Sequence, residues 1–539
     1  MKAYTSPSRR SVDEKHAIDS STVDANQLEG NTHPEGLKLA RDGRTVLVPQ
    51  PTDDPSDPLN WSWRKKHSVL LALAIVSFIP DFGTAMGSVT QIPQAKQWHK
   101  PVNTIAESIA INTMLSGVSG IVVVALSSFF GRAPVMFWMR LIVLGAVFWY
   151  AFAPNYGQFY SARILVGFFV GVGQSGGLMW IEDMFFRHEL PRKINLWSGF
   201  IIVRPALLAA LGHLPVPSCL LDEPSANLPV AQVSPYFGPW MANFVVWRES
   251  WRWVYYIYAI MNVVAFFVVC AFIDETCYDR RLPRDRQPAW RSRLLRLTGL
   301  ERHGRESLLE ALTRPFIAGT KLPVLIITVY YFLNFAWVIG VNTSTSVLLK
   351  AKYHFNGKQT ALFYFGPIVG SILSTILGHW VHDLFGRLYV RIHGGVFASE
   401  ARLWIIYVAS PFIGMAIMLI GYALQRHWNV YGLSILLGIQ IFGINIISTA
   451  VNAYLLDAYP EGSGEVDVWI VLGRTLGGML STYEQLPWVA RDGTAKVFSI
   501  QAGITWASLV LVIFLQIWGR RIREWQGPMK FPGTERKRA

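Results

Sequence analysis

The chain has 539 residues, of which 52% are hydrophobic, 13% aromatic and only 16% charged. This composition is too apolar for an ordinary soluble protein of that length, so it predicts a membrane protein. The formal net charge of +14 does not favour a nucleic-acid-binding protein, because the basic residues stand in short loops between apolar runs, as in the cytoplasmic loops of membrane proteins.

Residues 1–66 are rich in Ser, Thr, Asp, Glu and Pro and contain too little apolar material to fold alone. We therefore expect a disordered cytoplasmic tail. Its last residues, Arg64-Lys65-Lys66, form a basic cluster directly before the first apolar run. Such a cluster is typical of the cytoplasmic flank of a first transmembrane helix.

Twelve apolar runs follow, and a complete run has about the length that crosses a bilayer. They lie near residues 67–90, 107–129, 134–152, 160–182, a broken fifth from 194, 252–273, 323–349, 360–384, 403–424, 430–456, 467–489 and 497–518. We predict an all-α membrane protein with twelve transmembrane helices in two six-helix halves, residues 67–273 and 323–518. A basic loop, 274–322, separates the halves, and a basic tail, 519–539, ends the chain.

Twelve crossings place both termini on the same side of the membrane. The arginine-rich loop 274–322 and the Arg520-Arg521-Ile522-Arg523 cluster fall on that side as well. Basic loops face the cytoplasm in most membrane proteins. We therefore expect both termini to be cytoplasmic, and six helices, a long loop and six more helices indicate the two related halves of a secondary transporter.

Asp81 lies within the first apolar run, next to Pro80 and near Gly83 and Gly87, which loosen a regular helix. A carboxylate inside the membrane costs roughly 2.5–3.5 kcal/mol on insertion scales, so such a residue suggests a functional site. Asp81 lies about fourteen residues, roughly 21 Å, from the inner end of its helix. Arg163, near the outer end of the fourth run, has a similar depth. We expect the two to pair, as a switchable site or as a static pair that only fixes packing.

Other polar side chains near mid-depth could contact a substrate or join helices through hydrogen bonds. They are Gln174, Asn334 and Asn445. Arg474, in the eleventh run, is expected to pair with Asp457 or Glu465 at the cytoplasmic face. Glu182 and Asp183 are expected to form a solvated flank of the fourth run.

A short pattern occurs after both the second and the eighth runs. Gly131-Arg132 stand three and four residues after Ser128, and Gly386-Arg387 stand three and four residues after Asp383. An acid and an arginine at a tight glycine turn would form a latch between helix ends that opens when the halves rock. The alternative is an ordinary positively charged cytoplasmic turn.

These motifs resemble those of the major facilitator superfamily, over roughly residues 45–525. The matching residues are Gly131-Arg132-Ala133-Pro134, Arg163 with Gly167, Gly238-Pro239 in the fifth helix, Asp57-Pro58-Leu59-Asn60-Trp61 and Tyr459-Pro460-Glu461-Gly462. Together they are similar to the fungal drug:proton antiporter branch. The resemblance implies a central cavity lined by the first, fourth, seventh and tenth helices, and a conformational role for Gly238 and Pro239. Ser128, Ala133 and Ala242-Asn243 depart from the pattern of the antiporters.

The fifth crossing is interrupted by residues 204–233, an irregular stretch that contains five prolines together with Asp222 and Glu223. An irregular segment at mid-bilayer would leave backbone groups without partners. Joining Val203 directly to Ser234 restores a continuous span, so we interpret 204–233 as a retained intron or a similar gene-model artefact. The alternative is a crossing from 194 to 214, an external loop and a re-entrant segment, 234–247.

The expected function is transport without enzymatic chemistry, cofactor or metal, because the sequence has no phosphate-binding loop, nucleophile elbow or metal-ligand spacing. We expect a monomer in the lipid bilayer, by resemblance in the plasma membrane, that exports a small organic molecule in exchange for protons. No nucleic acid is expected as a partner. The alternatives are proton-coupled uptake of a cation such as a polyamine, and a non-transporting sensor on the same fold.

Overall fold

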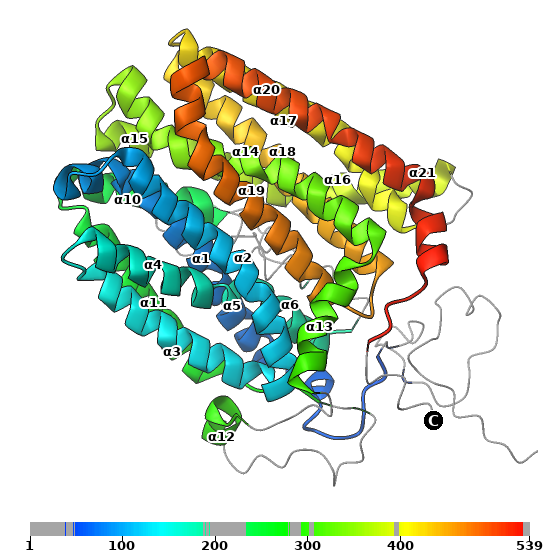
Figure 1. Ribbon diagram of the computed structural model, residues 1–539. Helices are drawn as coiled ribbons and strands as arrows, with labels where there is room; N and C mark the ends of the chain where they lie inside the picture. Colours follow the sequence, from blue (N-terminus) through cyan, green and yellow to red (C-terminus); the bar gives the residue numbers. More distant parts are fainter. Residues whose placement is uncertain are drawn as a thin grey trace, which may run out of the picture.

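The computed structural model describes residues 38, 47, 49–186, 189, 193, 233–278, 280, 293–300, 307–392 and 398–531. The regular structure of these residues is entirely helical, which confirms the predicted class. The N-terminal helices and the C-terminal helices form two bundles that pack side by side with their long helices running across the molecule in similar directions (Figure 1).

Among the described residues, the N-terminal bundle contains eight α-helical segments after a short 3₁₀ turn. They are η2 (Pro58–Asn60), α1 (Trp63–Trp98), α2 (Val102–Phe130), α3 (Arg132–Ala151), α4 (Tyr156–Val170), α5 (Val172–Ser175), α6 (Gly177–Met184), α10 (Ser234–Arg248) and α11 (Arg252–Phe272).

Two helices of the central loop and the C-terminal bundle follow. They are α12 (Arg293–Thr298), α13 (Leu308–Gly319), α14 (Leu322–Tyr353), α15 (Gly357–Phe363), α16 (Phe365–Ile392), η5 (Ser399–Leu403), α17 (Trp404–Gln425), α18 (Val430–Ala458), α19 (Ser463–Asp492), α20 (Thr494–Ala507) and α21 (Leu509–Gln526).

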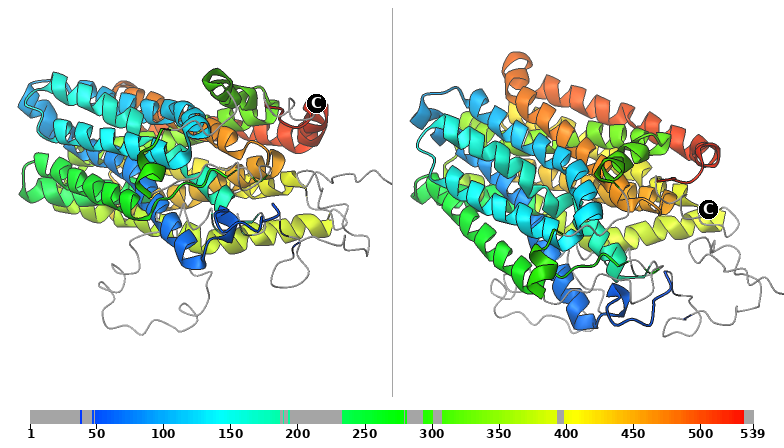
Figure 2. Two further views of the ribbon diagram at one scale, coloured as in Figure 1. Left: turned by 90° about the horizontal axis from the view of Figure 1, so that it is seen from below. Right: turned by 60° about the horizontal axis from the view of Figure 1, so that its bottom comes forward.

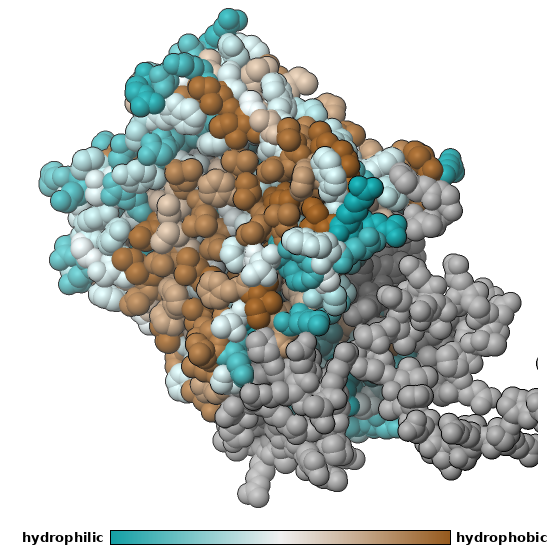
Figure 3. All heavy atoms as spheres, turned by 45° about the vertical axis from the view of Figure 1, so that its right-hand side comes forward, coloured by the Kyte–Doolittle hydropathy of each residue, from teal (hydrophilic) through white to brown (hydrophobic). Residues whose placement is uncertain are grey.

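Within the described residues, 10 helical segments are long and apolar enough to cross a membrane. A broad apolar area lies between hydrophilic ends on the face shown in Figure 3. The fifth and eleventh predicted crossings are not among the ten. For the fifth, the described part is the 15-residue helix α10. The eleventh corresponds to α19, which has 30 residues but is more polar, so the count of twelve stays a prediction.

Helix α19 is polar because it lies between the two bundles and packs along both α2 and α14 (Figures 1 and 2). Small residues allow this close packing. A Cβ atom at Gly477 would lie 2.6 Å from the carbonyl oxygen of Phe332, and one at Gly117 would collide with the Thr475 side chain. A helix enclosed by protein tolerates polar groups that a lipid-facing helix does not.

The fourth predicted run forms three consecutive segments, α4, α5 and α6, instead of one helix. The interruptions fall at Gly171 and Gly176. A Cβ atom at Gly171 would lie 2.4 Å from the Ser116 carbonyl oxygen, and one at Gly173 would lie 2.5 Å from the Val76 carbonyl oxygen. The irregular segment is thus pressed against α2 and α1, and an irregular backbone is tolerated in a membrane where protein covers it.

Residues 49–62, which composition assigns to the disordered tail, are ordered in the structure. Asp57 is fully buried. It caps η2 by accepting a hydrogen bond from the Leu59 backbone N–H, 3.0 Å away, and it forms an ion pair of 3.1 Å with Arg280 after α11. Composition alone misses this fold, because the segment is stabilised by a partner more than two hundred residues away.

Candidate functional site

Asp81 in α1 forms an ion pair with Arg474 in α19, at the contact between the two bundles. Arg474 Nη1 lies 3.3 Å from Asp81 Oδ2, and Nη2 lies 3.4 Å from Oδ1. The side chains retain 28% and 20% of their exposure, respectively. The pair therefore links a helix of the first half to a helix of the second half while remaining accessible.

Gln174, which lies in the interrupted fourth span, contacts Asp81 of the ion pair. Its Nε2 donates a hydrogen bond of 2.7 Å to Asp81 Oδ1. It lies in α5, between the glycines at which the helix is interrupted. The Gln174 Oε1 atom is enclosed and has no hydrogen-bond partner among the described residues. The predicted mid-depth residue thus contacts Asp81 and holds one unused acceptor.

Aromatic side chains surround the charged pair. The Arg474 guanidinium lies 5.5 Å from the ring centroid of Phe335 in α14, a cation–π distance. Tyr331, also in α14, is buried within electrostatic range of both members of the pair, and its hydroxyl lies 2.8 Å from Ser448 Oγ in α18. The site therefore combines one carboxylate, one guanidinium and aromatic faces, a set that suits a small solute with both polar and apolar parts.

The predicted pairing of Asp81 with Arg163 is wrong. Arg163 is 3% exposed, donates to Ser108 Oγ at 2.6 Å and lies 5.0 Å from the Phe159 ring centroid. It contacts α1 at Gly87, which is six residues, or about 9 Å, beyond Asp81. Similar depth was not enough, because pairing also requires that the two side chains point at each other around their helix axes.

The predicted partners of Arg474 are wrong as well. Asp457 pairs with Arg402, with 3.0 Å between Nε and Oδ2, and Glu465 pairs with Arg314 of α13, with 2.7 Å between Nε and Oε1. Arg474 lies three turns into α19, away from Asp457 at the end of α18 and from Glu465 at the start of α19. It reaches the centre of the protein instead.

The two predicted asparagines do not contact the Asp81–Arg474 pair. Asn334 donates to the Tyr330 carbonyl oxygen at 2.8 Å and to Ser508 Oγ at 2.9 Å. Asn445 donates to Ser371 Oγ at 3.2 Å and to Ser374 Oγ at 3.0 Å. Their hydrogen bonds join neighbouring helices of the second half.

The first predicted latch is built around Gly131, which has a φ of 95° between α2 and α3. Arg132 forms an ion pair with Asp183 at the end of α6. Glu275, after α11, accepts hydrogen bonds from the backbone N–H groups of Arg132 at 3.1 Å and Ala133 at 2.9 Å. Asp183 is therefore the acid of this latch and not a solvated flank as expected.

The second predicted turn is absent. Gly386 lies inside α16, which continues to Ile392, and both Asp383 and Arg387 are exposed along it. A helix in place of a turn cannot close as the first latch does. Gly238 in α10 has a clear packing role, because a Cβ atom there would lie 2.7 Å from the carbonyl oxygen of Phe82, the residue after Asp81. Pro239 follows it inside the same helix.

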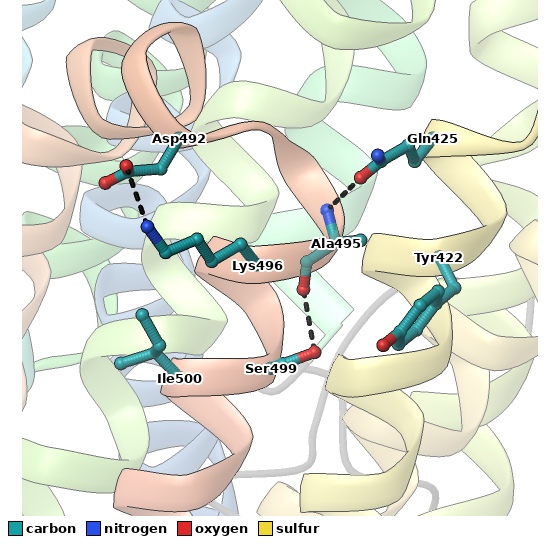
Figure 4. Close-up of a pocket in the computed structure, with 7 residues that line it drawn as sticks. All are labelled: Tyr422, Gln425, Asp492, Ala495, Lys496, Ser499 and Ile500. Carbon is teal, nitrogen blue, oxygen red and sulfur yellow. Dashed lines mark hydrogen bonds and ion pairs between the residues drawn. The ribbon is translucent and has the colours of Figure 1, made fainter.

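A pocket of about 580 Å³ lies far from this site, between α17 and α20 (Figure 4). Asp492 and Lys496 form an ion pair of 3.2 Å at its rim, and Gln425 reaches the Ala495 backbone N–H at 2.9 Å. Asp492 lies eighteen residues beyond Arg474, about 27 Å along α19. The pocket is therefore a feature of the opposite end of this helix and not part of the Asp81 site.

Comparison with known proteins agrees with this architecture. Residues 230–482 match the family model described as Major Facilitator Superfamily. The chain is 22% identical to the MFS-type transporter penM of Penicillium rubens, over 95% of this chain and 97% of that protein. It is also 22% identical to the efflux pump radE of Floropilus chiversii, over 87% of this chain and 83% of that protein.

The fold is similar to a solved structure of the xylose transporter XylE from E. coli, with a TM-score of 0.54 and 12% identity, over 84% of this chain and 97% of that one. The chain therefore carries a match to the major facilitator superfamily over residues 230–482. It is thus a multi-pass membrane protein and a secondary transporter of a small molecule, and not an enzyme.

The Asp81–Arg474 ion pair joins a helix of the first half to a helix of the second half. The sequence predicts the Asp81 carboxylate and Gln174 as site residues but places Arg474 at the cytoplasmic face. A signal for Arg474 existed, since a charged residue within a long run is costly unless it has a partner. The sequence did not show which acid that partner is.

Proposed function

We propose that this transporter exports a small organic molecule by alternating access in exchange for protons. The observation that carries the proposal is the Asp81–Arg474 ion pair between the first and second halves. Either a proton or a cationic group of the substrate on Asp81 would remove the charge that holds Arg474. The connection between α1 and α19 would then weaken.

The energetic argument follows from the surroundings of the pair. An unpaired charge inside the membrane region is costly, so Asp81 and Arg474 stabilise each other. A ligand that binds better when the pair is open shifts the population toward that state, by an amount equal to its difference in affinity. Binding at Asp81 is thus linked to the relative position of the halves, which is the coupling that proton exchange requires.

The direction of transport is supported by the relatives. The similarity to the efflux pump radE and the resemblance to the drug:proton antiporter branch favour export. Uptake of a cation such as a polyamine is the second candidate, favoured by the accessible Asp81 carboxylate and by the Phe335 ring, which already accepts the Arg474 cation. A sensor without transport on the same fold is the third.

The remaining proposed residues take supporting roles. We place Gln174 in the substrate and proton site, since it binds Asp81 directly, and Arg163, Asn334 and Asn445 in the framework of that site. Gly131 and Arg132 form the latch of the first half. Gly386 and Arg387, with Asp383, remain candidates for its counterpart in another state. Gly238 and Pro239 would set the approach of α10 to α1.

We also propose that residues 204–233 are absent from the functional protein. Apart from Val233, this segment lies outside the described residues. The proposal is supported by the family match, which begins at residue 230, and by α10, whose 15 residues are too few to cross a bilayer without the residues before the insert. Sequencing the transcript tests this, and a message encoding all thirty residues in an active protein contradicts it.

The orientation and location are proposals of the same kind. Lys65, Arg132 and Arg280 lie at the end of the bundle where α2 meets α3, and this concentration of basic residues supports a cytoplasmic location for that end. We propose a monomer in the plasma membrane with both termini in the cytoplasm.

The proposed function is tested in two stages. Growth and accumulation of candidate compounds in cells lacking or over-expressing the gene identify a transported compound. Purified protein in proteoliposomes is then tested for proton flux that depends on that compound. Outward movement of the compound with inward protons supports export, and inward movement of both supports uptake. Silence of both the full-length form and the form lacking 204–233 contradicts transport.

The Asp81→Asn variant tests the role of the carboxylate in the same assay. We expect it to reach the membrane and to lose proton coupling, because the amide cannot exchange a proton at neutral pH. The Asp492→Asn variant, at the far end of α19, is the matched control and should transport normally. Normal proton-coupled transport by Asp81→Asn would show that the carboxylate only supports packing.

A further inference from the structure

A second carboxyl group lies on the same helix as Arg474 and has no part in the site described above. Asp467 is in α19, seven residues before Arg474, and is only 9% exposed. Its Oδ2 atom is enclosed and has no hydrogen-bond partner within the described part of the chain. An ionised carboxylate in such a place lacks the donors that normally stabilise it, whereas a protonated one carries no charge to desolvate.

Asp467 and Arg474 lie on the same face of their helix. Seven residues correspond to almost two full turns and to about 10.5 Å along the axis. Of these two residues, Asp467 lies nearer to the end of the molecule that contains Arg132, because α19 begins at that end with Ser463 and Glu465. The Arg474 guanidinium interacts electrostatically with the carboxyl groups of both Asp467 and Asp81.

The other charged and titratable groups facing Asp467 can be named helix by helix. Glu182 of α6 acts on it from the Arg132 end, and Tyr331 of α14 lies within range of it as well as of Asp81. Glu465, on the same helix, is paired with Arg314 of α13. No cation among these groups is free to neutralise Asp467.

One further buried polar group, the Ser175 hydroxyl, lies beside the α2–α19 contact near Asp467. Gly120 of α2 would place a Cβ atom 3.6 Å from Val468, next to Asp467, and 2.5 Å from the Ser175 hydroxyl. The Ser175 Oγ atom is fully buried and lacks a partner among the described residues, as Asp467 Oδ2 does. Two unused buried polar atoms thus lie at the same level of the α2–α19 contact, on the Arg132 side of the central pair.

We propose that Asp467 is a second proton-binding site, coupled to Asp81 through Arg474. In the state described, Arg474 is held by the Asp81 carboxylate and Asp467 carries a proton. When Asp81 takes up a proton, Arg474 is released and stabilises Asp467 as the carboxylate. Asp467 then gives its proton to water at the Arg132 end, near Glu182, so the two carboxyls together hold one proton before and after the exchange.

This proposal deepens the proposed function and rests on its proton coupling for its consequence in transport. It supplies a separate entry and exit for the proton. Uptake at Asp81 and release at Asp467 would move protons toward the predicted cytoplasmic end, which is the direction that proton-driven export needs. A single acid at Asp81 would have to face both sides of the membrane in turn.

The test uses infrared spectroscopy of the full chain in lipid nanodiscs, without substrate, to follow the C=O stretch of protonated carboxyl groups during a pH titration. We expect one such band to be lost in Asp467→Asn and to be retained in Asp492→Asn. Asp467→Glu, which keeps the acid, should restore a band and guards against loss of folding. Persistence of the full band in a monodisperse Asp467→Asn protein would overturn the proposal.

Coupling is tested by the same titration in Asp81→Asn. Without the Asp81 charge, Arg474 is free to stabilise ionised Asp467, so the pH at which the band disappears should fall by about one unit, a tenfold change in proton affinity. An unchanged midpoint would overturn the coupling through Arg474. The measurement needs no substrate, so a failure of proton-coupled export would appear in the flux assay while the band and its shift remain.

Discussion

The Asp81–Arg474 pair makes a prediction about stability that can be worked out from its geometry. Two charge-assisted contacts, of 3.3 Å and 3.4 Å, join helices from different halves. Removing one partner of a fully buried pair costs about 3–5 kcal/mol, because the remaining charge is left without compensation. Since Asp81 keeps 28% and Arg474 20% of its exposure, water screens part of this, and we expect about 1–3 kcal/mol for each single substitution.

The double variant separates the pair from other effects. Asp81→Asn and Arg474→Gln each leave one charge unpaired, whereas both together leave two neutral amides of similar size. We therefore expect the double variant to be more stable than the sum of the single losses, with a coupling energy of about 1–2 kcal/mol. Thermal unfolding of the purified full chain in one detergent gives the four values of the cycle.

A matched cycle at Asp492 and Lys496 provides the control. That pair lies at the end of the same helix, at 3.2 Å, but the lysine is 66% exposed, and exposed pairs contribute at most about 1 kcal/mol. Additive losses at Asp81 and Arg474, with a coupling no larger than in this control, would refute the conclusion that the two residues form a stabilising link between the halves.

Two further predictions follow from contacts elsewhere in the molecule. Gly238→Val should lower thermal stability by about 1–3 kcal/mol and reduce transport, because the added atoms would overlap the Phe82 carbonyl oxygen of α1. The control is Gly145→Val, since a Cβ atom at Gly145 would have no neighbour within 4 Å. Equal effects of the two substitutions would contradict this prediction. Asp57→Ala should destabilise the chain by about 1.5–3 kcal/mol in the same unfolding assay, because it removes the carboxylate partner of Arg280. The control, Asp53→Ala, should have little effect, because the Asp53 side chain is 97% exposed.

Much of the fold was predictable because lipid imposes a local rule on sequence. A helix in contact with hydrocarbon must be apolar over about 20 residues, so ten of the predicted crossings correspond to helices recognisable in the structure. By the same rule a carboxylate inside an apolar run is costly, so Asp81 was predicted to mark a functional site. Helix α19 is an exception to this rule. It contains charged residues along its length because α2 and α14 cover it.

The sequence by itself determined the all-helical membrane class, the division into two halves and the presence of a costly carboxylate in the first helix. Only the tertiary structure decided its partner. Arg474 is 393 residues away from Asp81, and Arg163, of similar depth, faces Ser108 and Phe159 instead. Depth follows from position along a helix, but contact depends on which faces of which helices meet, and that is set by the packing of the whole bundle.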